Sequence, residues 1–422
     1  MGENSSLDCR HLCLSGKDER QIFKFDPQDY SVESLDLSRC GLTSIPSWVC
    51  SLKSMKKIDV SHNNLDNLPV ELGHIEKLEE IIATDNSDLL KDPFAQHIRE
   101  GPAKLAEFMK SIVKPKVPYT LEYQPIRYRR NPNLLSVFTW NILADSAISY
   151  DLYPLCEFKY LERQYRHEKI LERLSSVKSD VFLFQEIEKI QFEGSLISFF
   201  TNRNFFGHFV PKGRIKHKAS GLADFVFGQA TFINLRKFEV AATHKIESRY
   251  SRFIQDDPNI NELRAVDDVT LFTLIRTKGT DPKWILVINV HLKYKSENIR
   301  VPFLAAAYNE GIVFALSYCK SFGMIIAGDF NCLPDSVPIN NLFRMNSNLK
   351  RTHECFNENP TTVSMRGYKG CVDHIIFDSS YFKPNSLLRN LKEEEIANLC
   401  PVIPCSEYPS DHYPVGAQFE YI

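Results

Sequence analysis

The chain has 422 residues and a formal net charge of −2, with 43% hydrophobic and 25% charged residues. This length predicts two or three domains, and this balance is typical of a soluble globular protein. The charge total excludes a protein that coats nucleic acid over its whole surface, although a local basic groove stays open. No apolar run approaches the ~18 residues of a membrane span.

The N-terminus also lacks the apolar core of a secretory signal, so we expect no membrane association. Gly2 and Ser6 match the short pattern for N-myristoylation, which leaves that modification open. The 11 cysteines are scattered, and neither Cys9/His11/Cys13 nor Cys400/Cys405 has the spacing of a known zinc site. We interpret them as reduced thiols of a protein of the cytoplasm, with the nucleus also open.

A repeat occupies the first part of the chain. LDLSRCGLTSIP begins at Leu35, IDVSHNNLDNLP at Ile58 and IIATDN at Ile81, so the period is 23 residues. A short strand followed by a turn is the pattern of leucine-rich repeats. Three residues fill the Asn/Cys position of the repeat, and we expect them to cap backbone groups inside each turn: Cys40, Asn63 and Asn86.

Composition and pattern divide the chain into four segments. Residues 1–28 are predicted to be an N-terminal tail, and residues 29–113 the leucine-rich repeats with a capping helix in PAKLAEFMKSIV. Residues 114–134, rich in proline and charge, predict a linker. Residues 135–422 alternate short buried-strand runs with helical patterns, which predicts a layered α/β domain.

The expected strands of this domain are SVFTW, VFLFQ, WILVINVHL, MIIAGDF and VDHIIF, with a final strand near the C-terminus. Two helices are expected between them. The first should bury Ile170, Leu171, Leu174 and Val177. The apolar face of the second is predicted to comprise Leu304, Tyr308, Ile312, Leu316 and Cys319.

Polar side chains gather where these strands stop. Six endings carry them: Trp140 and Asn141, Gln185 and Glu186, Asn289 and His291, Asp329 and Asn331, Asp373 and His374, and Ser410 to His412. Each ending taken alone has an ordinary explanation as a loop or turn. Six together favour a site, because the ends of neighbouring strands in an open α/β sheet surround one crevice.

The chemistry of these residues narrows the reaction. The chain has no GxSxG-type elbow, which disfavours acyl transfer, and no glycine-rich phosphate loop with a lysine. Hard oxygen ligands combined with His and Asn fit a Mg²⁺ site that stabilises a phosphoryl transition state.

The order WN, QE, NxH, GDFN, a VDHI-type Asp and SDH resembles the endonuclease/exonuclease/phosphatase superfamily over residues 135–422. With a leucine-rich repeat in front, the chain resembles the leucine-rich-repeat exonuclease of the carbon catabolite repressor four type, the catalytic subunit of a cytoplasmic deadenylase complex. WNILADSAISYDLYP followed by Tyr165-Arg166, CLPDSVP and YKGCVDHIIF add to this likeness. The resemblance implies a four-layer α/β sandwich, two packed sheets flanked by helices, preceded by a short leucine-rich-repeat domain.

The resemblance also implies a ligand set for one or two Mg²⁺ ions. Glu186 would be the principal ligand, and Asn141 would lie beside it, holding both metal and phosphate. Asp411 would serve a second ion.

Five further residues receive catalytic roles from the same resemblance. Asp329 would orient and deprotonate the attacking water, while Asn331 and His412 would donate hydrogen bonds to the phosphate. Asp373 would orient His412, and His291 would contact the scissile phosphate. This division is physically consistent, since one base directs the water and the donors stabilise developing charge.

Base preference rests on fewer residues. Tyr368, in YKG, occupies the place of the aromatic residue that stacks on the terminal adenine. The proline expected soon after the NxH motif is absent until Pro302, with Ser296 near its place, and the family's DGxA motif is altered at residues 227–230. Lys212, Arg214, Lys216 and Lys218 form either a basic loop near the RNA entrance or a solvated loop.

The implied activity is Mg²⁺-dependent 3′-to-5′ removal of poly(A) from mRNA with release of 5′-AMP. The implied partners are poly(A) RNA and a second deadenylase subunit docked on the repeats. Two alternatives stay open: a phosphatase of the same superfamily acting on a phosphoinositide or nucleotide, and an inactive leucine-rich-repeat scaffold. The presence of Glu186, Asp329 and His412 argues against inactivity.

Overall fold

The computed structural model describes the two modules and most of the segments that join their elements. The described residues are 10–24, 31–87, 89, 94–113, 121–125, 134–148, 152–153, 155–212, 226–294, 296–352, 359–363, 369–389, 391, 395–396 and 403–422. Gly2, Arg214, Lys216, Lys218 and Tyr368 lie outside them, so the predictions made for these residues stay predictions.

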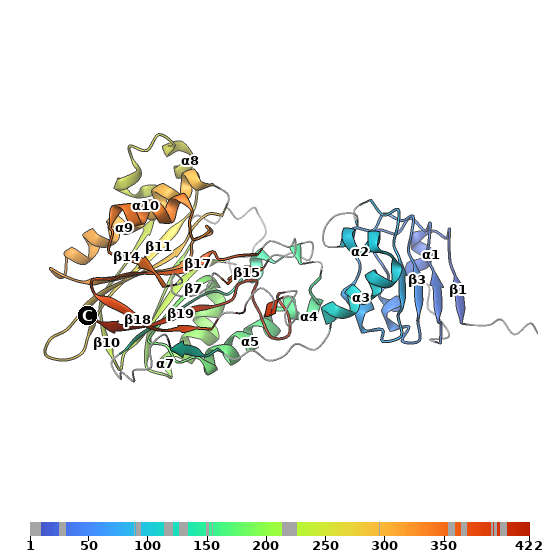
Figure 1. Ribbon diagram of the computed structural model, residues 1–422, viewed down its shortest axis with the longest axis horizontal. Coiled ribbons are helices and arrows are strands. Elements are labelled where there is room, and N and C mark those ends of the chain that lie inside the picture. Colours follow the sequence, from blue (N-terminus) through green and yellow to red (C-terminus); the bar gives the residue numbers. More distant parts are fainter. Residues whose placement is uncertain are drawn as a thin grey trace, which may run out of the picture.

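The N-terminal module is a stack of parallel strands joined by tight turns (Figure 1, blue). Its strands are β1 (His11–Cys13), β2 (Ser34–Asp36), β3 (Lys57–Asp59) and β4 (Glu80–Ile82). Their register follows the 23-residue period, because His11 pairs with Ser34, Ser34 with Lys57 and Lys57 with Glu80. The same period places a positive φ at one turn position of each unit: Gly16, Arg39, His62 and Asp85.

The repeat array therefore begins before residue 29. Strand β1 and helix α1 (Glu19–Phe23) form a further unit inside the segment predicted as a tail. The sequence pattern missed this unit because Lys17 stands where later units have Cys40 or Asn63. Gly16 nevertheless adopts the left-handed conformation that the turn requires, with φ +76°.

The expected capping role of the asparagines is confirmed. The Asn63 side-chain oxygen accepts from the backbone N–H groups of Cys40 and Leu42, and its amide nitrogen donates to three carbonyl oxygens. Asn86 makes the same kind of contacts one unit later. These bonds satisfy buried backbone groups that the tight turn cannot pair internally.

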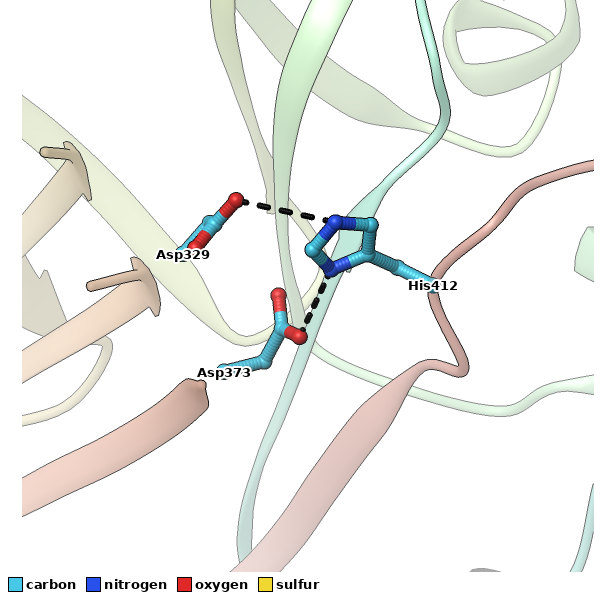
Figure 2. Close-up of side chains that lie close together, drawn as sticks. All are labelled: Asp329, Asp373 and His412. Carbon is cyan, nitrogen blue, oxygen red and sulfur yellow. Dashed lines mark hydrogen bonds and ion pairs between the residues drawn. The ribbon is translucent and has the colours of Figure 1, made fainter. Parts of the chain in front are cut away.

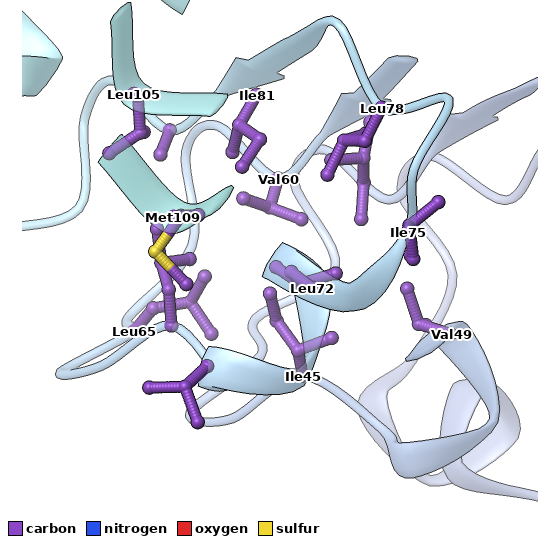
Figure 3. Close-up of a cluster of buried hydrophobic side chains, with 14 of the residues drawn as sticks. Ile45, Val49, Val60, Leu65, Leu72, Ile75, Leu78, Ile81, Leu105 and Met109 are labelled. Carbon is purple, nitrogen blue, oxygen red and sulfur yellow. The ribbon is translucent and has the colours of Figure 1, made fainter. Parts of the chain in front are cut away.

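Helices close the end of the repeat core. The module adds 3-10 turns η1 (Ser47–Ser51) and η2 (Val70–His74) and helices α2 (Phe94–Glu100) and α3 (Pro102–Val113). Leu105 and Met109 of α3 lie against the stacked leucines and isoleucines of the repeats (Figure 3). The predicted capping helix is thus confirmed.

The second module contains two large sheets and one small sheet among its described residues. One has the strand order β5-β18-β19-β6-β7-β9-β8: β5 (Tyr123–Pro125), β6 (Leu135–Asn141), β7 (Val181–Glu188), β8 (Phe205–Pro211), β9 (Phe227–Asn234), β18 (Phe382–Leu388) and β19 (Val415–Tyr421). The other has the order β10-β11-β12-β13-β17-β14: β10 (Phe238–Glu247), β11 (Val269–Thr277), β12 (Trp284–His291), β13 (Gly323–Asp329), β14 (Leu349–Arg351) and β17 (Asp373–Asp378). A small sheet pairs β15 (Thr362–Val363) with β16 (Lys369–Gly370).

Three hydrophobic layers hold this module together. Val137, Leu183, Val287 and Ile325 belong to the core between the two sheets. The outer faces are covered by α5 (Arg163–Ser176) and α7 (Ile197–Thr201) on one side, and by α8 (Ile260–Arg264), α9 (Glu297–Leu316) and α10 (Val337–Met345) on the other. Two short helices, α4 (Phe158–Leu161) and α6 (Lys189–Gln191), precede α5 and α7 in the chain, and Leu161 of α4 packs in the repeat core. Single turns complete it: η3 (Asp145–Ala147), η5 (Phe192–Leu196), η6 (Ser248–Tyr250) and η7 (Arg252–Ile254). The predicted four-layer α/β sandwich is confirmed.

The two predicted helices differ in outcome. In α5, Ile170 and Leu174 are buried as expected. In α9, Leu316 is 54% exposed, so that part of the predicted face is wrong. Cys319 lies beyond the helix end but packs against the same core. Small residues explain the difference, because α9 buries Ala306, Ala307, Gly311 and Ala315 against the sheet, and a leucine-based pattern does not count them.

Helix α9 also has the length and composition of a membrane span. Half of its apolar window is buried inside the fold, where Phe303 and Leu304 pack in the same core as Leu286 and Ile288 of β12. Such burial is that of a core helix. The segment predicted as a linker contains β5, the edge strand of its sheet, which pairs Tyr123 with Leu388 of β18.

Candidate active site

The strand ends that carry polar residues meet at one end of the sandwich. Strands β6 and β7 are parallel and place Asn141 beside Gln185, while parallel β12 and β13 place His291 beside Asp329. Asp373 reaches the same edge differently. It starts β17, which runs antiparallel to β13 and pairs Asp373 with Asp329.

Gln185 and Asn289 have a structural task. The Gln185 amide nitrogen donates to the Asn289 side-chain oxygen at 2.8 Å, across the interface between the sheets. Asn289 in turn donates to the carbonyl oxygens of Phe184 and Ala230. Both side chains are fully buried, and their network fixes one sheet against the other just below the site.

Glu186 is displaced from the strand pattern by a β-bulge. The pairing of β7 with β9 shifts between Gln185 and Ile187, and Glu186 has a φ of +54°. A bulge re-aims the side chain at this point, and a non-glycine residue in the left-handed region stores strain that functional sites often carry. Its Oε2 accepts from the backbone N–H of Ala144 at 3.1 Å.

The turn after β13 holds Asp329 and Asn331. Gly328 has a φ of +146°, and a Cβ there would lie 2.0 Å from the carbonyl oxygen of Val290, so this position requires glycine. Asn331, with φ +50°, donates its backbone N–H to Asp329 Oδ1 at 2.8 Å. Its side-chain amide donates to the carbonyl oxygen of Leu292 at 2.8 Å.

Asn141 joins carboxylates from the two sheets. Its Nδ2 donates to Glu186 Oε1 at 3.2 Å and to Asp329 Oδ2 at 3.0 Å, and its Oδ1 accepts from the Leu143 N–H at 3.0 Å. His291 Nε2 lies 3.7 Å from the same two carboxylate oxygens, which is too far for a hydrogen bond. A group bound between these side chains would therefore touch residues from both sheets.

The His412 ring lies between two aspartates (Figure 2). Nδ1 is 2.8 Å from Asp373 Oδ2, and Nε2 is 3.8 Å from Asp329 Oδ2. Burial by itself lowers the pKa of His412, but the negative charges of Asp373 and Asp329 outweigh it and hold the pKa well above its ordinary value. The ring is thus an imidazolium at neutral pH, a proton donor held by Asp373.

The pKa values of Asp329 and His291 are shifted mainly by burial. Burial raises the pKa of Asp329 to about 7, with Asp373 adding to the rise while His412 and hydrogen bonds oppose it. A carboxyl group with a pKa near neutrality suits a general base. Burial, followed by the charges of Lys212 and His412, holds the pKa of His291 well below its ordinary value.

The loop that carries Ser410 to His412 is hydrogen-bonded to β6. Ser410 Oγ donates to the Asn141 carbonyl oxygen at 2.6 Å, and Trp140 Nε1 donates to the His412 carbonyl oxygen at 2.8 Å. The fully buried Arg166 donates to the carbonyl oxygens of Pro409 and Ile142, and it also pairs with Asp145. In the sequence, the Tyr165-Arg166 pair only added to the family likeness, and nothing in it predicted that Arg166 connects these segments.

A cavity of about 760 Å³ opens beside these groups. Its lining includes Asn331, Asp411, His412 and Tyr294. The Asp411 Oδ2 atom accepts from the Tyr153 hydroxyl at 3.0 Å. Tyr153 belongs to the stretch WNILADSAISYDLYP that adds to the family likeness, but that likeness assigned it no role.

The predicted catalytic and metal-binding residues are thus brought together, while Tyr368, predicted to stack on the terminal adenine, lies outside the described residues. Of the predicted basic loop only Lys212 is described, and it pairs with Asp268 at 3.4 Å. The donor set fits a hard divalent cation, because Glu186, Asp329 and Asp411 offer carboxylate oxygens. Within the described chain, Asp411 Oδ1 and Asp373 Oδ1 are buried without a hydrogen-bond partner. Asp329, Asp373 and His412 also form a compact cluster, in which one ligand atom of each residue lies within 4.8 Å of the others.

Comparison with known proteins agrees with this geometry. The family model of the endonuclease/exonuclease/phosphatase family matches residues 138–412, and a leucine-rich-repeat model matches residues 31–52. The chain belongs to the endonuclease/exonuclease/phosphatase family. Enzymes of this family are metal-dependent.

Two relatives show the range of activities within the family. The chain is 28% identical over 311 residues to a probable CCR4-Not complex 3′-5′-exoribonuclease subunit Ccr4 of Vairimorpha ceranae, covering 67% of this chain and 63% of that protein. It is 24% identical over 324 residues to 2′,5′-phosphodiesterase 12 of Rattus norvegicus, covering 66% of this chain and 50% of that protein. The chain thus spans less than two thirds of the length of either relative.

A solved structure shows the same fold. The crystal structure of ANGEL2, a 2′,3′-cyclic phosphatase, in complex with adenosine-2′,3′-vanadate superposes with a TM-score of 0.59 at 19% identity. The match covers 71% of this chain and 98% of that chain.

Proposed function

We propose that this chain is a Mg²⁺-dependent 3′-to-5′ exoribonuclease that removes poly(A) from mRNA and releases 5′-AMP. The observation that carries the proposal is the placement of the His412 ring, held by Asp373 at Nδ1 and facing the buried Asp329 with Nε2. The pair supplies one proton donor and one proton acceptor at a single phosphodiester. The repeats in front of the site and the similarity to a protein named Ccr4 favour RNA as the substrate.

The roles of the residues follow from their positions. Ionised Asp329 accepts the proton of the attacking water, and His412 donates to a phosphate oxygen as charge develops. Asp373 holds the imidazolium in place, while Asn141 keeps Glu186 and Asp329 together. A Mg²⁺ ion held by Glu186 would supply Lewis-acid stabilisation of the phosphate charge.

A second candidate is a phosphodiesterase for 2′,5′ linkages. It is favoured by the similarity to 2′,5′-phosphodiesterase 12 of Rattus norvegicus, and it would use the same base and the same donor. A phosphatase of the superfamily is a third outcome, since the site hydrolyses phosphate esters generally.

One experiment separates these substrates. The full chain is incubated with 5′-labelled RNA ending in A, in U, or in 2′,5′-linked A, with Mg²⁺ or with EDTA. A ladder that recedes from the 3′ end, runs fastest on the 3′,5′-linked A tail, releases 5′-AMP and vanishes in EDTA and in Glu186→Ala supports the proposal. Faster loss of the 2′,5′-linked tail, or intact RNA in every lane, contradicts it.

We also propose that the repeats dock a second deadenylase subunit and that the protein acts in the cytoplasm, with the nucleus as the other compartment. The supporting observation is that the relative in Vairimorpha ceranae is named as a subunit of a complex. Affinity purification of the tagged chain tests this. Loss of the second deadenylase after deletion of residues 10–113, but not after Glu186→Ala, is the expected result.

A further inference from the structure

The segment between β6 and α5 lies between the repeat module and the active site. Leu155, Cys156 and Leu161 are 4%, 7% and 4% exposed, and they belong to the same hydrophobic cluster as the repeat core. Glu157 adds an ion pair with His74 of η2, with Oε2 and Nε2 at 3.2 Å. This segment is therefore packed against the repeats, as the closeness of α4 to that module in Figure 1 also shows.

The opposite side of the segment contacts the loop that carries the catalytic His412. The Cys156 thiol donates to the Pro404 carbonyl oxygen at 2.8 Å. Tyr153 is 8% exposed and belongs to the same cluster as the repeat core, while its hydroxyl donates to Asp411 Oδ2 at 3.0 Å. Tyr153 thus connects the repeat module to a carboxylate next to His412.

Asp411 depends on this contact for its orientation. Among the hydrogen bonds of the described residues, the Tyr153 hydroxyl is the donor to its carboxylate, and its Oδ1 is buried without a partner. Its main chain is fixed separately, because its carbonyl oxygen accepts from Thr362 Oγ1 at 2.9 Å. Burial and the Asp411 charge raise the pKa of Tyr153, which keeps the phenol protonated and able to donate.

We propose that Tyr153 is a positioning residue that orients the Asp411 carboxylate toward the bound cation, and that the repeat module holds Tyr153 in place. The inference rests on the proposed metal-dependent function of the same site. Groups that orient a metal-binding side chain change metal affinity or activity by about 10–100-fold when they are removed. The repeats are then part of the catalytic machinery of this chain as well as a docking surface.

The first test removes only the hydroxyl. Tyr153→Phe keeps the ring and its packing, and Tyr160→Phe is the matched control, because Tyr160 packs against the same cluster and has no hydrogen bond to Asp411. Mn²⁺ affinity of the full chain is measured by isothermal titration calorimetry, and kcat and KM are measured on A-tailed RNA. We expect Tyr153→Phe to weaken Mn²⁺ binding and to lower kcat by about 10-fold each. KM should stay unchanged.

The two readouts keep the proposals separate. A wild-type chain that binds Mn²⁺ but leaves RNA intact refutes the proposed exonuclease, while the Mn²⁺ titration still decides the role of Tyr153. Unchanged Mn²⁺ affinity in Tyr153→Phe, an equal loss in Tyr160→Phe, or a wild-type chain without Mn²⁺ binding would overturn the positioning role.

A double-mutant cycle tests the contribution of the repeats. Leu155→Ala loosens the packing on the module, and Leu155→Val is the milder variant if alanine prevents folding. We expect either variant to lower kcat and Mn²⁺ affinity in the wild-type background and to have no further effect in the Tyr153→Phe background, because both act through one hydroxyl. Additive losses in the double variant would show that the repeats do not act through Tyr153.

Discussion

The Gln185 side chain on β7 donates to the Asn289 side chain on β12 at 2.8 Å, from one sheet of the sandwich to the other. Glu186 directly follows the first of these residues, and His291 lies two positions after the second. The two halves of the active site therefore stand on opposite sheets, and this buried amide pair sets their relative position.

Replacing Asn289 by leucine should destabilise the fold and lower activity. The change removes the acceptor of Gln185 in the core, together with the side-chain donor to the carbonyl oxygens of Phe184 and Ala230. Each buried unsatisfied polar group costs about 1–3 kcal/mol. Urea denaturation followed by tryptophan fluorescence measures the loss. Asn340→Ala, which removes an exposed amide bonded to Asp335, is the control and should leave the unfolding free energy nearly unchanged. Equal stability of Asn289→Leu and wild type would rule out the bridging role.

The site residues at the strand ends could be predicted, because the motifs that contain them follow one another along the chain in the order that the family shows. Asn141, Glu186, His291 and Asp329 follow runs of buried residues, and parallel pairing brings those ends together. The features that could not be predicted depend on which distant segments of the chain pair with each other. Asp373 begins an antiparallel strand, and the functions of Gln185 and Asn289 depend on which sheet faces which.

Other misses have local causes. The bulge that aims Glu186 is a one-residue shift against β9, and the sequence of β7 alone does not show it. Strand β5 is three residues long and contains a proline, so it resembles a linker until its partner β18 is known. The first repeat unit lacks the Asn/Cys residue by which the later units were found.

Removing the charge of Glu186 should strongly lower turnover while leaving the fold intact. In Glu186→Gln one oxygen can still accept from Asn141, but the negative charge toward the cation is lost. Losses of preorganised charge stabilisation lower kcat on the order of 10²–10³-fold. Single-turnover cleavage of A-tailed RNA measures the rate, and Mn²⁺ titration should show weaker binding. Glu193→Gln, an exposed neighbour on η5, is the matched control and should act like wild type. A Glu186→Gln enzyme with normal turnover would remove Glu186 from the metal site.

Stability of the metal-free protein should fall as pH rises above about 6.5, the ordinary pKa of an unfolded histidine. In the folded state the pKa of Asp329 is raised to about 7 by burial, and the pKa of His412 is raised by Asp373 and Asp329. Both groups therefore bind protons in the folded state that the unfolded chain has already released. Each group contributes its full stabilisation below its pKa in the unfolded chain, and this contribution is lost as pH rises through its pKa in the folded state. Between the two pKa values, each proton lowers the free energy of unfolding by about 1.4 kcal/mol per pH unit.

His291 does not offset this trend. Its lowered pKa gives the opposite sign, but both its folded and unfolded forms are neutral above pH 7. Thermal unfolding in EDTA across this range measures the slope. Asp329→Asn should flatten the part near pH 7, and a wild-type midpoint that rises with pH would contradict the assigned protonation of the Asp329–His412 pair.

Asn63→Ala should destabilise the repeat module and, through it, lower catalytic turnover. The side chain is 5% exposed and caps the turns of two successive repeat units, and its loss leaves the N–H groups of Cys40 and Leu42 unpaired. Unpaired buried donors cost about 1–3 kcal/mol each, so limited proteolysis should cut the module faster. Asn64→Ala is the control, because that neighbour is exposed. If the module holds Tyr153 against Asp411, Asn63→Ala also lowers kcat on A-tailed RNA while KM stays constant. Faster proteolysis with unchanged kcat would instead show that the catalytic domain keeps its geometry without the repeats.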